Sequence, residues 1–591
     1  MTWEMGFVLF TLLLMMIGLI FELARPDMIV FISLTIFLLT GILTPDEALK
    51  GFSNQGMLTI ALLFIIAGAV QKSGIVDRST TKLIGNSNSP RLSMARMLIP
   101  ISGFSAFLNN TPIVVTFTPL IRKWCEEKGI SPSKFLIPLS YATILGGTMT
   151  LLGTSTNLVV HGLMLDFGMQ GFTLFQLGIV GVPAVIIGLI YIIFIGYRIL
   201  PNNKVMTETV KEHTREYIAE MTVENNYESI NQSVKNAGLR KLNGLYLIEI
   251  IRKDERISPV KGSTKIKSGD RLIFTGLIST IAELQNVRGL TLYTGTDLNL
   301  DTLKNGNVQL VEAVVSHQSG LLYKQIRDTE FRSRFDAAVI AVHRNNERVE
   351  SKIGDIALKA GDTLLLIGGP DFEKRVRDLT DFYVTTPLDK PSILEDQKKG
   401  WIALGTLLSM IALVTFGVLS MFKAMALTVV ILLFSRVITP EEAKRSVQFN
   451  VLLLIASAFG IGMAILKTGT AEWIANALVH IGKPFGIIAV LLLIYLLTNI
   501  FTEVITNSAA AVMMFPIGME VSGKMSVDPM AFSVLIAIAA SASFITPIGY
   551  QTNLIVYGPG GYKFTDYMKI GIPLSLIVMV ITVFMVNLVY I

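Results

Sequence analysis

The stretches GTSTNLVVHG (153–162) and GYQTNLIVYG (549–558) repeat one phrase at an offset of 396 residues, each time within very apolar sequence. Three further pairs follow in the same order at offsets of 395 to 397: TPDEA at 44–48 with TPEEA at 439–443, KSG at 72–74 with KTG at 467–469, and NNTPIVVTFTP at 109–119 with TNSAAAVMMFP at 506–516. Four ordered matches at nearly one offset predict that the chain is an internal duplication.

The composition predicts a membrane protein with a soluble insertion. Only 16% of the 591 residues are charged, whereas soluble proteins carry about 25%. Charge-free runs such as 5–21, 135–165 and 167–197 suit membrane spans, because a spanning helix needs about 20 apolar residues. Residues 202–400 are rich in charge. We therefore expect an N-terminal transmembrane repeat at 1–200 and a C-terminal one at 398–591.

Each half offers five spans and one broken apolar piece. The expected spans are 5–23, 27–43, 55–72, 133–165 and 173–200, then 401–421, 423–438, 449–468, 530–557 and 567–591. The broken pieces are 91–125, interrupted at 109–112, and 484–523, interrupted at 506–508. If both are re-entrant hairpins, each half crosses five times and the second half is inverted. The predicted fold is a polytopic α-helical membrane protein with an inverted repeat of five spans plus one re-entrant hairpin each.

Loop charges indicate the orientation in the cell (plasma) membrane. With residue 1 outside, Lys and Arg gather on the inner side, in 73–92, 122–134 and 439–448, as the positive-inside rule expects. The central domain is then cytoplasmic and the C-terminus outside. Lys423 and Lys467 are exceptions, because both fall outside.

The central region is doubled as well. IKSGDRLIFTG (266–276) matches LKAGDTLLLIG (358–368), and IRKDERI (251–257) matches HRNNERV (343–349), both at an offset of 92. Each unit alternates short strands with a Gly-Asp turn and ends in a helix-like stretch, 279–287 or 371–379. This α+β pattern resembles the C-terminal domain of regulators of potassium conductance, in copies at 202–288 and 289–390. Two interpretations stay open: a ligand sensor or dimer-forming gate, with an unknown regulatory nucleotide as one ligand, and a ligand-free assembly module.

Broken helices in a membrane expose backbone groups, which is tolerated only where they line a cavity or are buried in protein. Half-helix N-termini attract anions, and freed carbonyls coordinate Na⁺. The interruptions carry small neutral hydrogen-bonding residues: Asn109, Asn110, Thr111, Thr506, Asn507 and Ser508. Gly153 and Gly549 favour unwound backbone. The alternative is that these residues only join or cap helices. Glu503 is an intramembrane carboxylate and a candidate for a proton or charge role.

Several chemistries find no support in the sequence. The single cysteine, Cys125, and five scattered histidines argue against zinc, iron or cysteine-rich metal sites. No nucleophile–histidine arrangement or phosphate loop suggests an enzyme. The pI near 9.1 is explained by basic loops, so no nucleic-acid partner is expected.

The paired hairpin-tip motifs, the two Thr-Asn-Leu phrases and PIGYQTNLIVYGPGGYKFTDYMKIGIPL (547–574) resemble the divalent-anion:sodium symporter family over the whole chain. The resemblance implies a homodimer and two Na⁺ sites around one anion. The implied sodium site 1 comprises Ser105, Asn109, Asn110 and the Gly153 carbonyl, and site 2 comprises Thr502, Thr506, Asn507 and the Gly549 carbonyl. The implied anion contacts are Asn110, Thr111, Asn507 and Ser508, with Thr154 and Tyr550 nearby.

The resulting functional prediction is sodium-coupled symport of a small inorganic or organic dianion by alternating access, with at least two Na⁺ per anion. Sulfate is favoured, because Ser155-Thr156 and Gln551-Thr552 replace the Thr-Pro-Pro-type phrase usual in the family's dicarboxylate carriers. Three alternatives stay open: a dicarboxylate symporter, a Na⁺/H⁺ antiporter or oxyanion exporter that uses Glu503, and an anion or nucleotide sensor with a transporter fold.

Overall fold

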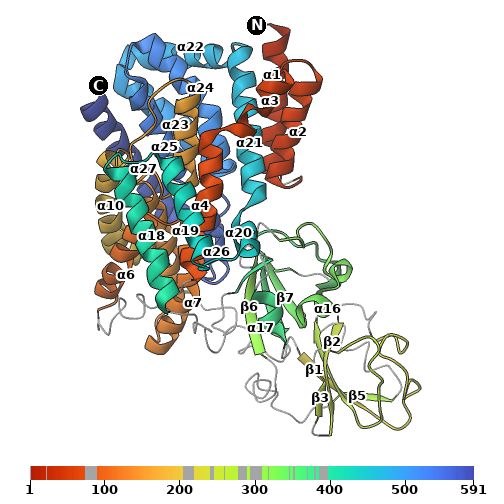
Figure 1. Ribbon diagram of the computed structural model, residues 1–591. Coiled ribbons are helices and arrows are strands. Elements are labelled where there is room, and N and C mark those ends of the chain that lie inside the picture. Colours follow the sequence, from red (N-terminus) through yellow and green to blue (C-terminus); the bar gives the residue numbers. More distant parts are fainter. Residues whose placement is uncertain are drawn as a thin grey trace.

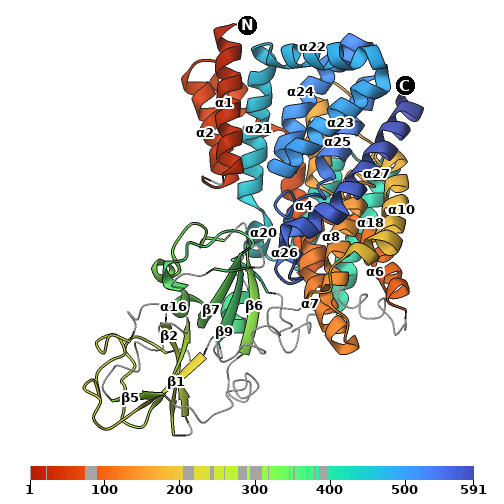
Figure 2. The same cartoon turned by 180° about the vertical axis from the view of Figure 1, so that it is seen from behind.

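The computed structural model contains a bundle of apolar helices with two β-sheets below one end (Figure 1). It describes residues 2–21, 23–72, 89–203, 218–239, 245–253, 255–257, 260–276, 289–292, 309–316, 319–344, 347–349, 353–368, 371–377, 381–384 and 397–591. Both chain ends lie at the end of the bundle opposite the sheets (Figures 1 and 2).

The N-terminal half begins with a helix at Trp3. Its elements are α1 (Trp3–Ile20), α2 (Pro26–Leu39), α3 (Pro45–Leu49), η1 (Lys50–Ser53), α4 (Gln55–Lys72), α6 (Pro90–Ser105), α7 (Asn110–Lys128), η2 (Pro132–Lys134), α8 (Leu136–Gly147), α9 (Ser155–Asp166), α10 (Gly178–Tyr191), η3 (Ile192–Gly196) and α11 (Tyr197–Ile199). Proline opens α2, α3 and α6, because its fixed φ suits the first helical position and its missing N–H costs nothing there.

The C-terminal half continues with α18 (Gln397–Thr415), α19 (Met421–Phe434), α20 (Pro440–Ser446), α21 (Phe449–Lys467), α22 (Thr470–Gly482), η6 (Lys483–Phe485), α23 (Ile487–Val504), α24 (Asn507–Met525), α25 (Pro529–Ser541), α26 (Gln551–Tyr557) and α27 (Phe564–Tyr590). Among the described helices, six are long and apolar enough to cross a membrane. The polytopic helical fold is thus confirmed. Helix α22, which crosses the end of the bundle in Figure 1, was not predicted.

Helices are interrupted at matching places in the two halves. The predicted interruptions at 109–112 and 506–508 separate α6 from α7 and α23 from α24. The expected spans 133–165 and 530–557 are not continuous helices, because 148–154 separates α8 from α9 and 542–550 separates α25 from α26. Within its described residues, each half therefore carries two such helix breaks, as the tip motifs and Gly153 and Gly549 suggested.

Two crosswise ion pairs join the halves. Lys467 lies 2.7 Å from Glu47, and Lys72 lies 2.7 Å from Glu442. These are the lysines and glutamates of the matched KSG/KTG and TPDEA/TPEEA motifs. The glutamates belong to α3 and α20, which start with the same Thr–Glu capping box and lie at opposite ends of α4 and α21 in Figure 1. Lys467, an exception to the charge rule, thus has a carboxylate partner.

The described residues of the central region form two five-stranded sheets. The first has the order β3-β2-β4-β1-β5 and the second β10-β6-β9-β7-β8. The strands are β1 (Ile218–Val223), β2 (Leu245–Arg252), β3 (Glu255–Ile257), β4 (Arg271–Gly276), β5 (Leu290–Leu292), β6 (Gln309–Val315), β7 (Ala337–Arg344), β8 (Glu347–Arg348), β9 (Thr363–Gly368) and β10 (Phe382–Val384). Read from β8, the second order repeats the first, and all the strand pairs are antiparallel.

The Gly-Asp turn has the same supports in both sheets. Arg252 forms a bidentate salt bridge with Asp270, and Arg344 forms one with Asp362, again at an offset of 92. The expected helix at 371–379 is α17 (Phe372–Arg377), preceded in this unit by η4 (Ile326–Thr329), α16 (Phe331–Phe335) and η5 (Ile353–Asp355). The expected helix at 279–287 lies outside the described residues.

Two glycines let neighbouring helices approach the breaks. A Cβ at Gly181 of α10 would lie 2.3 Å from the Thr148 carbonyl oxygen, and one at Gly571 of α27 would lie 2.1 Å from that of Phe544.

We predict that Gly571→Ala lowers the free energy of unfolding by about 1–3 kcal/mol, the usual cost of overpacking. Thermal unfolding of the purified protein in detergent measures it. Gly405→Ala, where a Cβ meets nothing within 4 Å, is the control, and equal behaviour of the two variants would contradict the prediction.

Candidate functional site

The two hairpin tips are held by one repeated arrangement. Ser105 Oγ lies 2.5 Å from Asn110 Oδ1 and 2.8 Å from the Thr143 carbonyl oxygen. In the second half, Thr502 Oγ1 lies 2.9 Å from Asn507 Oδ1 and 2.6 Å from the Ala540 carbonyl oxygen. Each tip asparagine is therefore tied to the preceding half-helix, which is itself joined to the helix before the second break.

The Thr-Asn-Leu phrases stabilise the second breaks. Asn157 Nδ2 donates to the carbonyl oxygens of Gly147 (3.0 Å) and Thr150 (2.8 Å). Asn553 Nδ2 donates to those of Ser543 and Thr546, both at 3.1 Å. These carbonyls lie at the end of the first helix segment and within the break, where helical partners are lost. Sequence reasoning used the repeated phrase but did not assign this role to its asparagines.

Residues of both halves meet at the first tip. Asn110 Nδ2 donates to Tyr550 Oη at 2.7 Å, and Thr154 Oγ1 lies 3.1 Å from the same oxygen. Thr111 Oγ1 donates to Gln551 Oε1 at 3.1 Å. Four of the six residues predicted at or near the anion are thus brought together: two of the four predicted contacts and both nearby residues, with Gln551 as an additional member.

The other two predicted anion-contacting residues lie on the second tip. Asn507 and Ser508 begin α24, and Ser508 is buried. Among the described residues, neither is hydrogen-bonded to the group around Tyr550. The described contacts therefore assemble only the first-tip part of the predicted anion site.

Neutral oxygens gather where the sodium sites are expected. A Cβ at Gly147 would lie 3.0 Å from Asn110 Oδ1 and 3.2 Å from the Gly153 carbonyl oxygen, so two expected ligands of site 1 lie near one point. At site 2, Thr506 Oγ1 is buried and is without a hydrogen-bond partner among the described residues. Hard cations prefer such oxygen ligands, so these residues fit Na⁺. Asn109 is the N-cap residue of α7 and is only half-buried.

Glu503 is engaged with the second break. Its two carboxylate oxygens accept from the backbone N–H groups of Ile545 and Thr546, both at 2.8 Å, and a Cβ on Gly549 would lie 3.0 Å from Oε2. At the corresponding position of the first half stands Ala106. Glu503 therefore stabilises unwound backbone beside expected sodium site 2.

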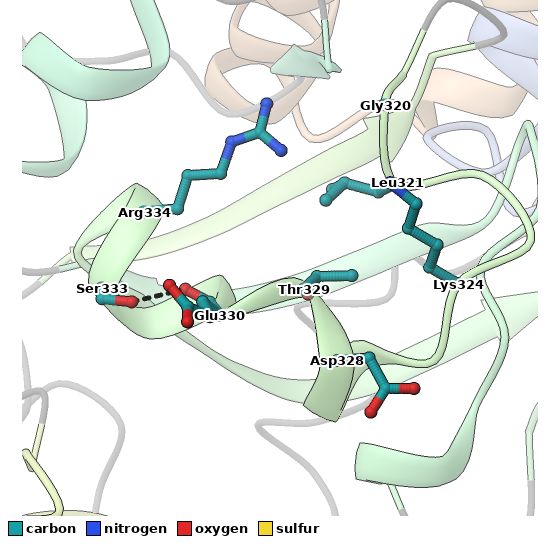
Figure 3. Close-up of a pocket in the computed structure, with 8 residues that line it drawn as sticks. All are labelled: Gly320, Leu321, Lys324, Asp328, Thr329, Glu330, Ser333 and Arg334. Atoms are coloured by element: carbon teal, nitrogen blue, oxygen red, sulfur yellow. Dashed lines mark hydrogen bonds between the residues drawn. The ribbon is translucent and has the colours of Figure 1, made fainter.

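A separate pocket of about 470 Å³ lies in the second sheet unit. Figure 3 shows its lining between Gly320 and Arg334. Lys324 and Arg334 are balanced there by Asp328 and Glu330, and Arg334 is paired with Asp381 at 2.7 Å. This mixture of charges is not the basic cluster that a phosphate-bearing ligand would need, so the pocket does not establish the predicted nucleotide site.

The bundle and its paired breaks define a polytopic secondary transporter. A family model described as "Citrate transporter" matches residues 16–537, and the chain belongs to this family of the ion transporter superfamily. The "Putative sulfur deprivation response regulator" of Chlamydomonas reinhardtii is 34% identical over 94% of this chain and 97% of its own length. An uncharacterized transporter of Synechocystis is 33% identical over 94% of this chain and 92% of its own length. A "Probable sodium/sulfate cotransporter 3" of Chlamydomonas reinhardtii is 25% identical over 92% of this chain and 83% of its own length.

We predict that Asn553→Ala loosens the second break, because the buried Ser543 carbonyl and the partly buried Thr546 carbonyl lose their donor, and an unmet buried group costs about 1–3 kcal/mol. Hydrogen–deuterium exchange should show faster exchange in 542–550 than in the unmodified protein. Asn476→Ala, at an exposed position of α22, is the matched control. Unchanged exchange in Asn553→Ala would show that the asparagine does not hold the break.

Proposed function

We propose that the protein is a sodium-coupled symporter of a divalent anion, with sulfate as its substrate. The observation that carries the proposal is the meeting of Asn110, Thr154 and Tyr550 from two broken-helix motifs. No Lys or Arg occurs in 97–121 or 504–519, so neutral donors and the coupling ions would have to stabilise the anion. The sodium/sulfate cotransporter among the relatives supports this choice of ion and substrate.

The movement we infer is alternating access by an inverted repeat. The crosswise pairs Lys72–Glu442 and Lys467–Glu47 and the opposite positions of α3 and α20 (Figure 1) support an approximate two-fold axis between the halves. In such transporters one body carrying the broken helices moves against another. The expected orientation, with both termini outside and the sheets cytoplasmic, agrees with the termini and sheets lying at opposite ends.

Electrostatics sets the minimum coupling. Moving one charge across 100 mV costs about 2.3 kcal/mol, so a dianion entering a negative interior costs about 4.6 kcal/mol. Two Na⁺ ions cancel this cost, and a third would let the membrane potential drive uptake. We therefore propose at least two Na⁺ per anion, one at each tip. The homodimer and a nucleotide ligand of the sheets remain proposals from the family resemblance.

We predict Na⁺-dependent uptake of radiolabelled sulfate into proteoliposomes. Asn110→Ala and Asn507→Ala should each reduce uptake at least tenfold, because each removes a tip side chain expected to serve the anion and one Na⁺ ion. Asn476→Ala should retain full uptake. Sulfate uptake that is unchanged when the Na⁺ gradient is removed would contradict sodium coupling.

The same vesicles decide the substrate. Unlabelled succinate and citrate compete with labelled sulfate in parallel samples, because the family description names citrate. Uptake of labelled succinate or citrate without sulfate uptake would keep the mechanism and replace the substrate.

A second candidate function is sensing, which is favoured by the relative described as a sulfur deprivation response regulator. A sensor would bind the anion through the same tips without net transport. Purified protein in lipid vesicles, with no other protein present, distinguishes the two: specific sulfate binding without uptake would support the sensor.

Proton exchange is tested at Glu503. Because the Glu503 carboxylate is engaged with two backbone N–H groups, we infer a structural role for it. We therefore predict that Glu503→Gln, which keeps one of the two acceptor oxygens, retains sulfate uptake within about threefold across external pH 6 to 8. Glu503→Ala, which removes both acceptors, should reduce it further. Proton movement measured with a pH-sensitive dye, if lost in Glu503→Gln together with uptake, would instead support an antiporter.

A further inference from the structure

The two sheets differ at one buried carboxylate. Glu220 on β1 and Glu312 on β6 occupy equivalent positions 92 residues apart. In the first unit Glu220 pairs with Arg271 of the neighbouring strand β4. In the second unit Thr363 replaces this arginine, and Glu312 pairs at 2.6 Å with Arg122 of α7, both side chains being at most 3% exposed.

Arg122 is also specific to one half of the bundle. α7 and α24 are equivalent helices that follow the tips, and the position of Arg122 is occupied in α24 by Met519. Of these two helices, α7 carries the arginine, and its Arg122 contacts the second sheet at Glu312. Removing one partner of a buried ion pair is strongly destabilising, because the other charge stays buried, so this contact can anchor the second sheet.

The same sheet contacts α26. A Cβ at Gly361 would lie 2.4 Å from Leu554 Cδ1, whereas one at the equivalent Gly269 of the first unit would meet nothing within 4 Å. Thr363 Oγ1 lies against Gly558, where a Cβ would be 1.7 Å away. Figure 2 shows α7 and α26 on the side of the bundle facing the second sheet.

The two contacted helices lead directly to the candidate site. α7 begins at Asn110 and α26 at Gln551, and their first residues are joined by the Asn110–Tyr550 and Thr111–Gln551 hydrogen bonds. Arg122 is 12 residues from Asn110, about 18 Å along a helix, and Leu554 is one turn from Tyr550. α7 and α26 are thus connected in two places: directly at their first residues in the candidate site, and through the second sheet, which contacts both helices farther along.

We propose that the second sheet unit is a brace that fixes α7 against α26, and that Arg122 and Glu312 are positioning residues for the substrate site. The brace sets the separation of Asn110 and Tyr550 and hence the apparent affinity for the anion. This inference rests on the proposed function for its transport readout. The first sheet unit, whose carboxylate is paired internally, does not share the role.

The test compares Arg122→Met, the double variant Arg122→Met/Glu312→Leu, and Arg271→Met as the matched control. Arg122→Met removes the buried ion pair between α7 and the second sheet, so the sulfate concentration for half-maximal uptake should rise about fivefold or more, with the maximal rate changed less than twofold. The double variant replaces the pair with apolar groups, which often preserves a buried contact, and should recover most of the affinity. Arg271→Met breaks the first unit's pair and should leave the half-maximal concentration unchanged.

Hydrogen–deuterium exchange of 551–562 provides a readout independent of transport. Faster exchange in Arg122→Met and recovery in the double variant support the brace, even if the unmodified protein transports no sulfate and the proposed function fails. The brace is overturned by unchanged exchange, by a loss of maximal rate without a loss of affinity, or by Arg271→Met behaving like Arg122→Met.

Discussion

The need to satisfy backbone carbonyls inside an apolar bundle underlies the whole architecture. A break in a helix frees backbone polar groups for binding. Each freed group needs a partner within the protein, because the membrane core contains no water that could form the hydrogen bond. Asn157 and Asn553 solve this problem in the same way, each giving one amide group to two carbonyls. With those donors in place, Gly153 and Gly549 can leave the helical conformation without exposing unmet groups.

Much of this arrangement could be predicted from the sequence because helix breaks leave strong local signals. Charge-free runs, neutral polar tips and repeated phrases located the helices and the interruptions. The partners across the halves could not be predicted, because a spacing of 440 residues between Asn110 and Tyr550 carries no local signal. α22 was missed for another reason: Glu472 and His480 interrupt its apolar character, so it did not match the pattern of a span.

The two halves are similar in scaffold and different in chemistry. The Tyr550 side chain of the second half reaches Asn110 at the first tip. Its counterpart in the first half is Thr154, whose shorter side chain is hydrogen-bonded to the Tyr550 hydroxyl. Glu503 adds a carboxylate beside the second break where the first half has Ala106. The two halves thus place unequal chemical groups beside their matched breaks.

The crosswise Lys–Glu pairs have a consequence for the origin of the chain. Each half contains one lysine and one glutamate of the set, and each gives its lysine to the other half's glutamate. That is the isologous pattern of a two-fold symmetric dimer, in which residue i of one subunit meets j of the other and j meets i. Two copies of a single half could form both pairs without the central sheets, so the present protein has the contact pattern of a homodimer fused into one polypeptide.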